Sequence, residues 1–362
     1  MKIAIFGVGL IGGSLALCFK NKPDITVAGH EIDPLKAENL LKRQVVDEAS
    51  TSMEETARNA DFIFLCVPVG CLEDYLLKLT QMPIKPGCVI TDVGSTKASI
   101  TRYAKSIELG GAYFIGGHPM AGKEQSGVEA ASSHLFENAY YVLTPDEHIP
   151  EAIFNQLEQI LQATKASIVR MDAQQHDQTV GAISHLPHIL AASLVNLVEG
   201  YHQKNPLYGQ LAAGGFHDIT RIASSNPLIW RDILLHNKDV ILTLLQDWSE
   251  QVAFFQTYLE QSDGEQLAKQ FEKAKMFRSR LPERRKGVLS AWYDIYVDIP
   301  DHPGIIGQIT SLLGGNHINL RNIQIMENRL DVPGVLRLSF RKQEDMDFAV
   351  ELLRNNDYSV QV

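Results

Sequence analysis

The feature that most constrains this chain is a glycine-rich turn directly after its first β-branched run. Residues 2–6 favour a strand, and Gly7-Val8-Gly9-Leu10-Ile11-Gly12 follows them and opens a helical pattern. In this context a GxGxxG turn lets backbone amides approach a pyrophosphate at a helix N-terminus. Glu31 follows Gly12 at the distance of a carboxylate that binds both ribose hydroxyls and would repel a 2′-phosphate. The glycine turn and Glu31 therefore predict a Rossmann-type domain that binds NAD rather than NADP.

The rhythm of residues 1–171 supports this prediction, because short β-branched runs alternate with helical patterns. Such a rhythm is typical of an α/β fold in which helices cover both faces of a doubly wound, mostly parallel sheet. The expected strands are residues 2–6, 25–28, 61–67, 89–92, 113–115, 140–143 and 167–169. The expected NAD contacts are Gly7, Gly9, Leu10, Ile11 and Gly12 in the turn, Glu31, and Val67 and Pro68.

Two further domains are expected after residue 171. Residues 172–282 lose the strand pattern, and long apolar-periodic segments such as 228–261 predict an all-α domain. Its apolar surface, including Trp248, Phe254 and Phe255, predicts packing against a second subunit. Residues 282–286 form a polar, basic linker, and residues 289–362 favour the order βαββαβ of a ferredoxin-like sandwich. Its expected elements are strands 292–299, 320–326, 335–341 and 358–362, and helices 303–313 and 344–354.

Composition narrows the class of protein. The 33 basic and 43 acidic residues give a net charge of −10, which disfavours nucleic acid and anionic membranes as partners. The four cysteines include no CxxC pair, which favours a reduced, cytoplasmic setting. The apolar opening run contains several glycines and no small-residue cleavage site, so it does not fit a signal peptide. We find no apolar stretch of the roughly 18 residues that a membrane helix needs.

Two polar residues stand where strands of the first domain end, which is the ligand-binding edge of an open α/β sheet. Ser95 lies in Asp92-Val93-Gly94-Ser95-Thr96-Lys97, and His118 lies in Gly117-His118-Pro119-Met120-Ala121-Gly122. A neutral imidazole there can accept the proton of a substrate hydroxyl while hydride leaves the same carbon. Ser95 could orient His118 through a hydrogen bond. The alternatives are a turn histidine before a proline and a helix N-cap serine.

The all-α domain supplies a second polar cluster. It contains His176, the segment Ser184-His185-Leu186-Pro187-His188, whose proline predicts a helix kink, and Arg221. Arg221 offers a planar, bidentate fork for a substrate carboxylate, with a surface ion pair as the alternative. Zinc is an alternative ligand for the histidines, but no carboxylate or thiolate stands at a familiar ligand spacing beside them, so we expect no metal.

Five motifs in order closely resemble prephenate dehydrogenases across essentially the whole chain: GVGLIGGSLA, DVGSTK, GGHPMAG, SHLPH and GGFHDITRIASSNPLIWRD. The resemblance implies NAD-dependent oxidative decarboxylation of prephenate to 4-hydroxyphenylpyruvate in tyrosine biosynthesis. It implies that His118 partners the ring hydroxyl, that Ser95 aids it and that Arg221 anchors a carboxylate. The further pocket residues that it implies are His176, Ser184, His188 and Gly214, with Trp230 reaching the neighbouring subunit's site in a homodimer.

The chain departs from the family pattern at Lys123 and His217, which leaves the local substrate contacts open. Arogenate or cyclohexadienyl dehydrogenase activity is an alternative, because arogenate differs from prephenate by an ammonium in place of a ketone. Activity as another hydroxyacid dehydrogenase is a more distant alternative. A non-catalytic, nucleotide-gated amino-acid sensor is the alternative from another class, although a sensor needs no base beside the nicotinamide.

The tail resembles an ACT domain, an amino-acid-sensing module, through Asp301-His302-Pro303-Gly304-Ile305-Ile306-Gly307. Free amides at the start of the following helix suit an amino-acid carboxylate. The resemblance implies feedback inhibition by tyrosine, and a purely structural, dimerising tail is the alternative. The expected effector contacts are Asp301, Pro303, Gly304, Ile305, Asn316 and Asn319.

Overall fold

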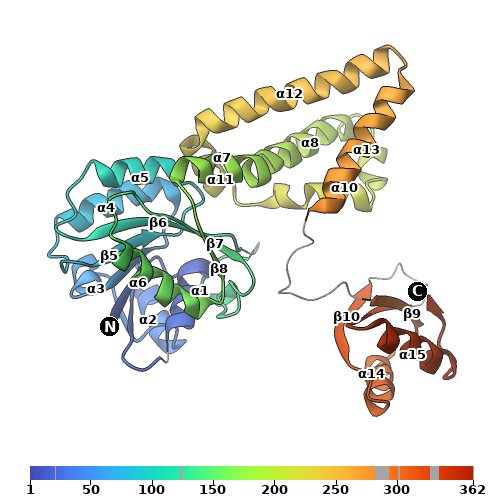
Figure 1. Ribbon diagram of the computed structural model, residues 1–362, viewed down its shortest axis with the longest axis horizontal. Helices are drawn as coiled ribbons and strands as arrows, with labels where there is room; N and C mark the ends of the chain where they lie inside the picture. Colours follow the sequence, from blue (N-terminus) through green and yellow to red (C-terminus); the bar gives the residue numbers. More distant parts are fainter. Residues whose placement is uncertain (21, 123–124, 282–292, 301, 327–333, 362) are drawn as a thin grey trace. The chain divides into compact units, whose positions relative to one another are not determined.

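A computed structural model describes the chain except for residues 21, 123–124, 282–292, 301, 327–333 and 362. It divides into two units, Met1–Lys275 and Met276–Val362 (Figure 1). The expected linker 282–286, the effector candidate Asp301 and the family departure at Lys123 lie outside the described residues.

An eight-stranded sheet of order β3-β2-β1-β4-β5-β6-β7-β8 forms the framework of the first unit. The strands β1 to β6 pair in parallel, β7 is antiparallel to β6, and β8 is parallel to β7. This confirms the predicted Rossmann-type fold, and the sheet contains β3, which the sequence did not suggest. The strands are β1 (Lys2–Phe6), β2 (Thr26–His30), β3 (Glu48–Ser50), β4 (Phe62–Leu65), β5 (Val89–Asp92), β6 (Tyr113–Pro119), β7 (Tyr140–Thr144) and β8 (Ser167–Arg170).

Both faces of this sheet are buried, because alternate residues of each central strand enter different cores. In β1, Ile3 and Ile5 join one core while Ala4 and Phe6 join the other. The first core packs under α1 (Leu10–Phe19), α2 (Pro34–Lys42) and α6 (Glu151–Leu161). The second packs under α3 (Met53–Ala57), α4 (Leu72–Thr80) and α5 (Ala98–Lys105) (Figure 1).

Helices alone make up the rest of the first unit. The predicted helical segment 228–261 consists of two helices, which meet at the buried Asn237. The helix continues past Pro187, because the preceding turn, Gly181–His185, is a π turn. A π turn does not use the regular i→i−4 hydrogen bonds, which are the bonds that a proline would interrupt. The helices are α7 (Ala173–Val180), α8 (Leu186–His202), α9 (Leu207–Gln210), α10 (Gly214–Thr220), α11 (Pro227–His236), α12 (Lys238–Glu260) and α13 (Gly264–Arg280).

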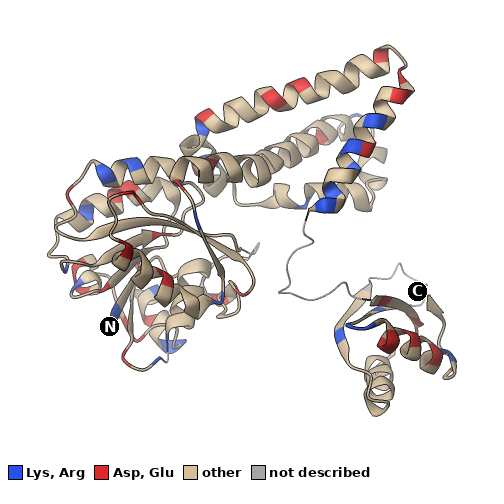
Figure 2. Ribbon diagram, viewed as in Figure 1, with Lys and Arg blue, Asp and Glu red and all other residues tan. Residues whose placement is uncertain are grey.

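These helices expose apolar side chains. Helix α8 is almost entirely tan in Figure 2, because Glu199 is its one Asp, Glu, Lys or Arg residue. On α12 the side chains of Trp248, Val252 and Phe254 are each more than 40% exposed. Phe255 is instead partly buried and packs edge-on against Phe271. An exposed apolar face of this kind is typical of a subunit interface.

The continuous run Ala173–His202 passes the length and composition test for a membrane span, with mean hydropathy 1.4. The expectation that no apolar stretch reaches about 18 residues was therefore wrong by this test. The test averages hydropathy over the segment, so a segment with a few polar residues can still pass it. A core helix of a soluble protein passes the same test. The run also carries buried His176, Asp177 and His185, which hydrogen-bond to His118, to Lys97 and to Asn237, respectively, outside the run.

The second unit has the predicted βαββαβ order. Its antiparallel sheet, β10-β11-β9-β12, packs on two helices around a core that includes Ile309, Leu336 and Leu353. The elements are β9 (Tyr293–Ile299), α14 (Ile305–Gly315), β10 (Leu320–Met326), β11 (Gly334–Phe340), α15 (Gln343–Arg354) and β12 (Val360–Gln361). This confirms the ferredoxin-like class for the tail.

Candidate active site

The glycine turn after β1 has room for a pyrophosphate on one side only. Gly7 has φ +85°, a conformation that favours glycine, and a Cβ on Gly12 would lie 2.2 Å from the Gly7 carbonyl oxygen. In contrast, a Cβ on Gly9, the residue before α1, would meet no heavy atom within 4 Å. Gly7 and Gly12 therefore close the turn, and Gly9 leaves space where a dinucleotide pyrophosphate can approach the amides of Leu10 and Ile11.

Glu31 lies at the end of β2 and points to this turn. Its Oε1 accepts a 2.7 Å hydrogen bond from the Val8 amide, and its side chain is partly exposed. The remaining carboxylate oxygen is available to ribose hydroxyls, as the sequence predicts. Val67 lies against Gly7, and Pro68 opens the 3₁₀ turn Val69–Cys71 after β4, at the same edge of the sheet. These residues fit the nucleoside half of NAD.

His118 is a residue of β6 itself. The expectation that it follows the strand was wrong, because β6 runs to Pro119 and His118 pairs with Val142 of the antiparallel β7. Since β1 and β6 point the same way, His118 and the glycine turn lie at the same edge of the sheet. Burial, His176, Lys97 and His185 hold the pKa of the His118 imidazole well below its ordinary value of 6.5. A neutral imidazole is the form that can act as a base.

A chain of hydrogen bonds extends from His118 into the helical part. His118 Nδ1 and His176 Nε2 are 2.8 Å apart, and His176 Nδ1 is 2.7 Å from Asp177 Oδ1. The side chains of His176 and Asp177 are fully or almost fully buried. His176 therefore uses both ring nitrogens within the protein, whereas the family resemblance implies that it lines the substrate pocket.

Asp177 joins the helical part to the loop that contains Ser95. Its Oδ1 accepts a 2.7 Å hydrogen bond from the Lys97 amide, and its Oδ2 accepts one of 2.8 Å from the Ala98 amide. These bonds satisfy free amides at the start of α5. Asn237 in turn donates to the Asp177 backbone carbonyl and to His185 Nδ1, at 2.9 and 3.1 Å. Asp177 is not among the residues predicted from the sequence, because neighbouring residues on a helix do not normally face each other.

Ser95 does not orient His118 in this structure, whose imidazole bonds to His176 instead. The Ser95 backbone bonds to His185, whose pKa is lowered to about 4 mainly by burial. The hydroxyl of Ser95 thus stays available to a ligand. The hydrogen bond that the sequence expectation assigned to Ser95 is made here by His176 of the helical part, at His118 Nδ1.

A buried ion pair underlies this loop. Lys97 Nζ bonds to the Asp92 carboxylate and donates to the Gly117 carbonyl at 2.8 Å, and both side chains are 0% exposed. Asp92 also accepts hydrogen bonds from the amides of Gly94 and Gly117, at 2.8 and 3.2 Å. The pair therefore ties the end of β5 to β6, directly before His118.

The expected carboxylate anchor, Arg221, and several of the expected pocket residues lie in the helical part. His188 stacks on Trp230, with ring centroids 3.6 Å apart, and its Nδ1 bonds to the Ser184 carbonyl at 2.9 Å. Burial lowers the pKa of His188, and Arg221 lowers it further through its charge. Arg221 begins the turn after α10, the helix that Gly214 opens. Trp230 stacks on His188 of its own chain, and its reach to the neighbouring subunit's site stays a prediction.

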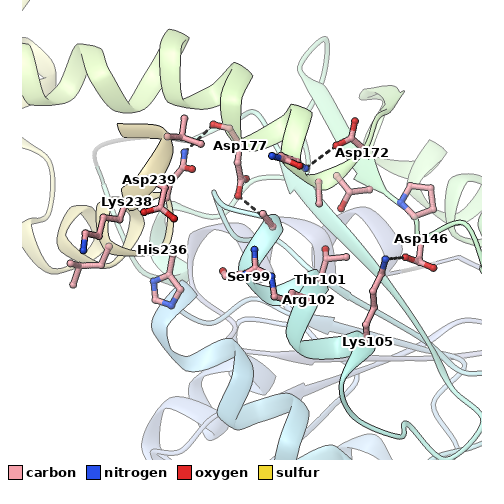
Figure 3. A pocket seen from close by; sticks show the side chains of 18 of the residues that line it. Ser99, Thr101, Arg102, Lys105, Asp146, Asp172, Asp177, His236, Lys238 and Asp239 are labelled. Atoms are coloured by element: carbon pink, nitrogen blue, oxygen red, sulfur yellow. Dashed lines mark hydrogen bonds and ion pairs between the residues drawn. The ribbon is translucent and has the colours of Figure 1, made fainter. Parts of the chain in front are cut away.

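Two cavities lie in different parts of the chain, and His118 lines neither of them. One of about 910 Å³ is lined by α5, the segment after β7 and the α11–α12 junction; Figure 3 shows Ser99, Arg102 and His236 facing it and the Lys105–Asp146 ion pair at its edge. The other, of about 650 Å³, lies in the second unit and is lined by Pro303, Gly304 and Ile305 among others. Asn316 and Asn319 do not line it.

Two remaining observations concern residues left open by the sequence. His217 is exposed on α10 and contacts the Phe216 ring edge-on. Among the described residues, no group of three or more His, Cys, Asp or Glu side chains is arranged to hold a metal ion.

Comparisons with known proteins agree on one family. Residues 15–170 match the model "Prephenate dehydrogenase, nucleotide-binding domain", and residues 172–273 match "Prephenate dehydrogenase, dimerization domain". The chain is 44% identical over 346 residues to a prephenate dehydrogenase of Bacillus subtilis, covering 95% of this chain and 93% of that protein.

Solved structures give the same result. A prephenate dehydrogenase from A. aeolicus, in complex with hydroxyphenyl propionate and NAD+, matches with a TM-score of 0.71 and 28% identity, covering 78% of this chain and 98% of that one. A Synechocystis arogenate dehydrogenase matches with a TM-score of 0.69 and 32% identity, covering 77% of this chain and 99% of that one.

Proposed function

Because this chain belongs to the prephenate dehydrogenase family, and is thus an NAD-dependent dehydrogenase, we propose that it oxidatively decarboxylates prephenate to 4-hydroxyphenylpyruvate. The observation that carries the proposal is the His118 imidazole, kept neutral at the edge of the sheet where the glycine turn also lies. Base and cofactor turn thus share one edge, as hydride and proton removal from one hydroxyl-bearing carbon requires.

His118 takes the proton of the ring hydroxyl on its free Nε2. NAD, when bound, accepts the hydride from the carbon that bears this hydroxyl. The ring carboxylate then leaves as CO2, its bonding electrons make the ring aromatic, and the oxygen recovers the proton from His118. Arg221, beside His188 and Trp230, is suited to hold a carboxylate of the substrate by charge-assisted hydrogen bonds. Ser95 offers its hydroxyl to the same ring oxygen.

Substitution of the base tests this function. For His118→Asn we expect kcat with NAD and prephenate to fall roughly 10²- to 10⁴-fold, the usual contribution of a general base, with KM little changed. His148→Asn is the matched control, because His148 is a solvent-exposed histidine outside the site. NADH formation is the measurement, and near-normal turnover of His118→Asn would remove the residue from the base role.

Arogenate is the alternative substrate, because one structural relative is an arogenate dehydrogenase. Arogenate carries an ammonium where prephenate carries a ketone. The described groups that act on His188 are the Ser184 carbonyl and the cationic Arg221, and a cation there favours the ketone. Parallel assays with both substrates distinguish the two, and activity with neither, in a protein that binds NADH, would favour the sensor.

We also propose that tyrosine inhibits the enzyme through the second unit, which acts as an ACT domain, and that the enzyme is a cytoplasmic homodimer joined by the exposed apolar helices. The cavity beside α14 supports an effector site, since Gly304 and Ile305 open that helix and line the cavity.

A substitution that fills this cavity tests the effector site. Gly307 lines it and a Cβ there meets nothing within 4 Å, so Gly307→Leu should weaken tyrosine inhibition and leave basal turnover unchanged. Gly314→Leu on the same helix is the control, because Gly314 has similar space but does not line the cavity. Equal inhibition of both variants would refute this site, and sedimentation of the full chain tests the dimer.

A further inference from the structure

We propose that His176 and Asp177 are positioning residues that fix which ring nitrogen of His118 carries a proton, so that Nε2 is left free as the base. This inference rests on the base role of His118 in the proposed function. It assigns His176 to the interior of the protein, whereas the family resemblance implies a substrate contact.

The hydrogen-bond chain determines the proton positions from its acidic end. An ionised carboxylate only accepts hydrogen bonds, so the 2.7 Å contact between Asp177 Oδ1 and His176 Nδ1 requires a proton on that nitrogen. In neutral His176 the other nitrogen, Nε2, then has a lone pair. Because Nε2 lies 2.8 Å from His118 Nδ1, the proton between them belongs to His118 Nδ1. His118 Nε2 is consequently unprotonated.

The carboxylate cannot turn away from His176. Its two oxygens already accept hydrogen bonds from the Lys97 and Ala98 amides at the start of α5, at 2.7 and 2.8 Å. His176 is 0% exposed and Asp177 is 2% exposed, so little of either side chain is open to solvent. The rings of His118 and His176 meet edge to face at 71°, which directs the nitrogen of one to the nitrogen of the other. Burial and fixed partners thus hold the orientation of the base before substrate binds.

Acid should reverse this arrangement. A doubly protonated His176 would donate to His118 Nδ1, and His118 would then carry its proton on Nε2 and could not accept another. The charged and titratable groups that act on His118 are His176, Lys97 and His185, and Asp177 contacts His176.

Two substitutions of His176 separate hydrogen bonding from packing. Leu removes the acceptor for His118 and the donor for Asp177, whereas Gln keeps a carboxamide oxygen and an amide for the same partners. We expect His176→Leu to lower kcat roughly 10²- to 10⁴-fold, the contribution of a correctly protonated base, with KM and NADH binding unchanged. His176→Gln should recover most of this loss. Equal kcat values for the two variants, or a raised KM with unchanged kcat, would overturn the inference.

A spectroscopic measurement tests the same inference without turnover. In protein labelled with [15N]histidine, the ring signals of His118 are identified by their loss in His118→Asn. We expect a protonated Nδ1 and an unprotonated Nε2 in the full chain at neutral pH. A protonated Nε2 would overturn the inference even if prephenate is a substrate, and failure to oxidise prephenate would refute the proposed function without changing the tautomer.

Discussion

Gly9→Ala should weaken cofactor binding strongly without damaging the fold. A Cβ at this position would meet no heavy atom of the protein within 4 Å, and φ of Gly9 is −84°, outside the left-handed region that favours glycine. The lower entropy of the unfolded chain offsets the preference of an N-cap for glycine over alanine, so the free energy of unfolding should change by no more than about 1 kcal/mol. The methyl group would instead occupy the space that a pyrophosphate needs.

The expected loss follows from the hydrogen bonds that the methyl group blocks. One charge-assisted hydrogen bond contributes about 1.5–3 kcal/mol, so losing one weakens NADH binding about 10- to 150-fold. Gly12→Ala is the matched control, because its Cβ would lie 2.2 Å from the Gly7 carbonyl oxygen and 3.0 Å from Cys66 Cβ. The backbone must shift there, which costs about 1–3 kcal/mol or more of stability.

Fluorescence titration with NADH and thermal unfolding of both variants give the two quantities. The expected pattern is weak binding at wild-type stability for Gly9→Ala, and a lowered Tm for Gly12→Ala. If Gly9→Ala binds NADH as tightly as the wild type, the pyrophosphate does not pass over Gly9 and the assignment of the turn is wrong.

Three other outcomes follow from the site. Arg221→Ala should raise KM for prephenate about 10- to 150-fold through loss of a charge-assisted contact of about 1.5–3 kcal/mol, and an unchanged KM would refute the anchor. Burial and neighbouring basic groups lower the pKa of His118, so its neutral form persists below pH 6.5 and is lost only as the pH falls further. The acid limb of the pH profile of kcat should therefore lie below pH 6.5. An acid limb above pH 6.5 would contradict this prediction. Lys97→Met should lower the free energy of unfolding, measured by urea titration, by about 3–5 kcal/mol. The reason is that Asp92 keeps its amide donors but loses its buried counter-charge. A change below about 1 kcal/mol would show that the ion pair is dispensable for stability.

Local patterns made the architecture predictable. The apolar strands of the first unit lie in a sheet buried on both faces, so they appear in the sequence as β-branched runs, and the βαββαβ order of the tail is likewise visible as alternating periodicities. The one strand that was missed, β3, is short and exposed at the sheet edge, where little apolar burial marks it. Its pairing with β2 depends on the neighbouring strand rather than on its own sequence.

The nucleotide turn and His118 could be identified from the sequence, because a glycine turn between strand and helix and a polar residue near a strand end are local signals. Arg221 was a candidate because of its guanidinium chemistry. The partner of His118 depends on the three-dimensional fold. Asp177 lies about 60 residues from His118 in the chain, and the π turn after α7 and the junction at Asn237 help to bring the helical part against the loop of Ser95. Hydrogen bonds between segments so far apart have no period in sequence, so the tautomer of the base is a property of the fold.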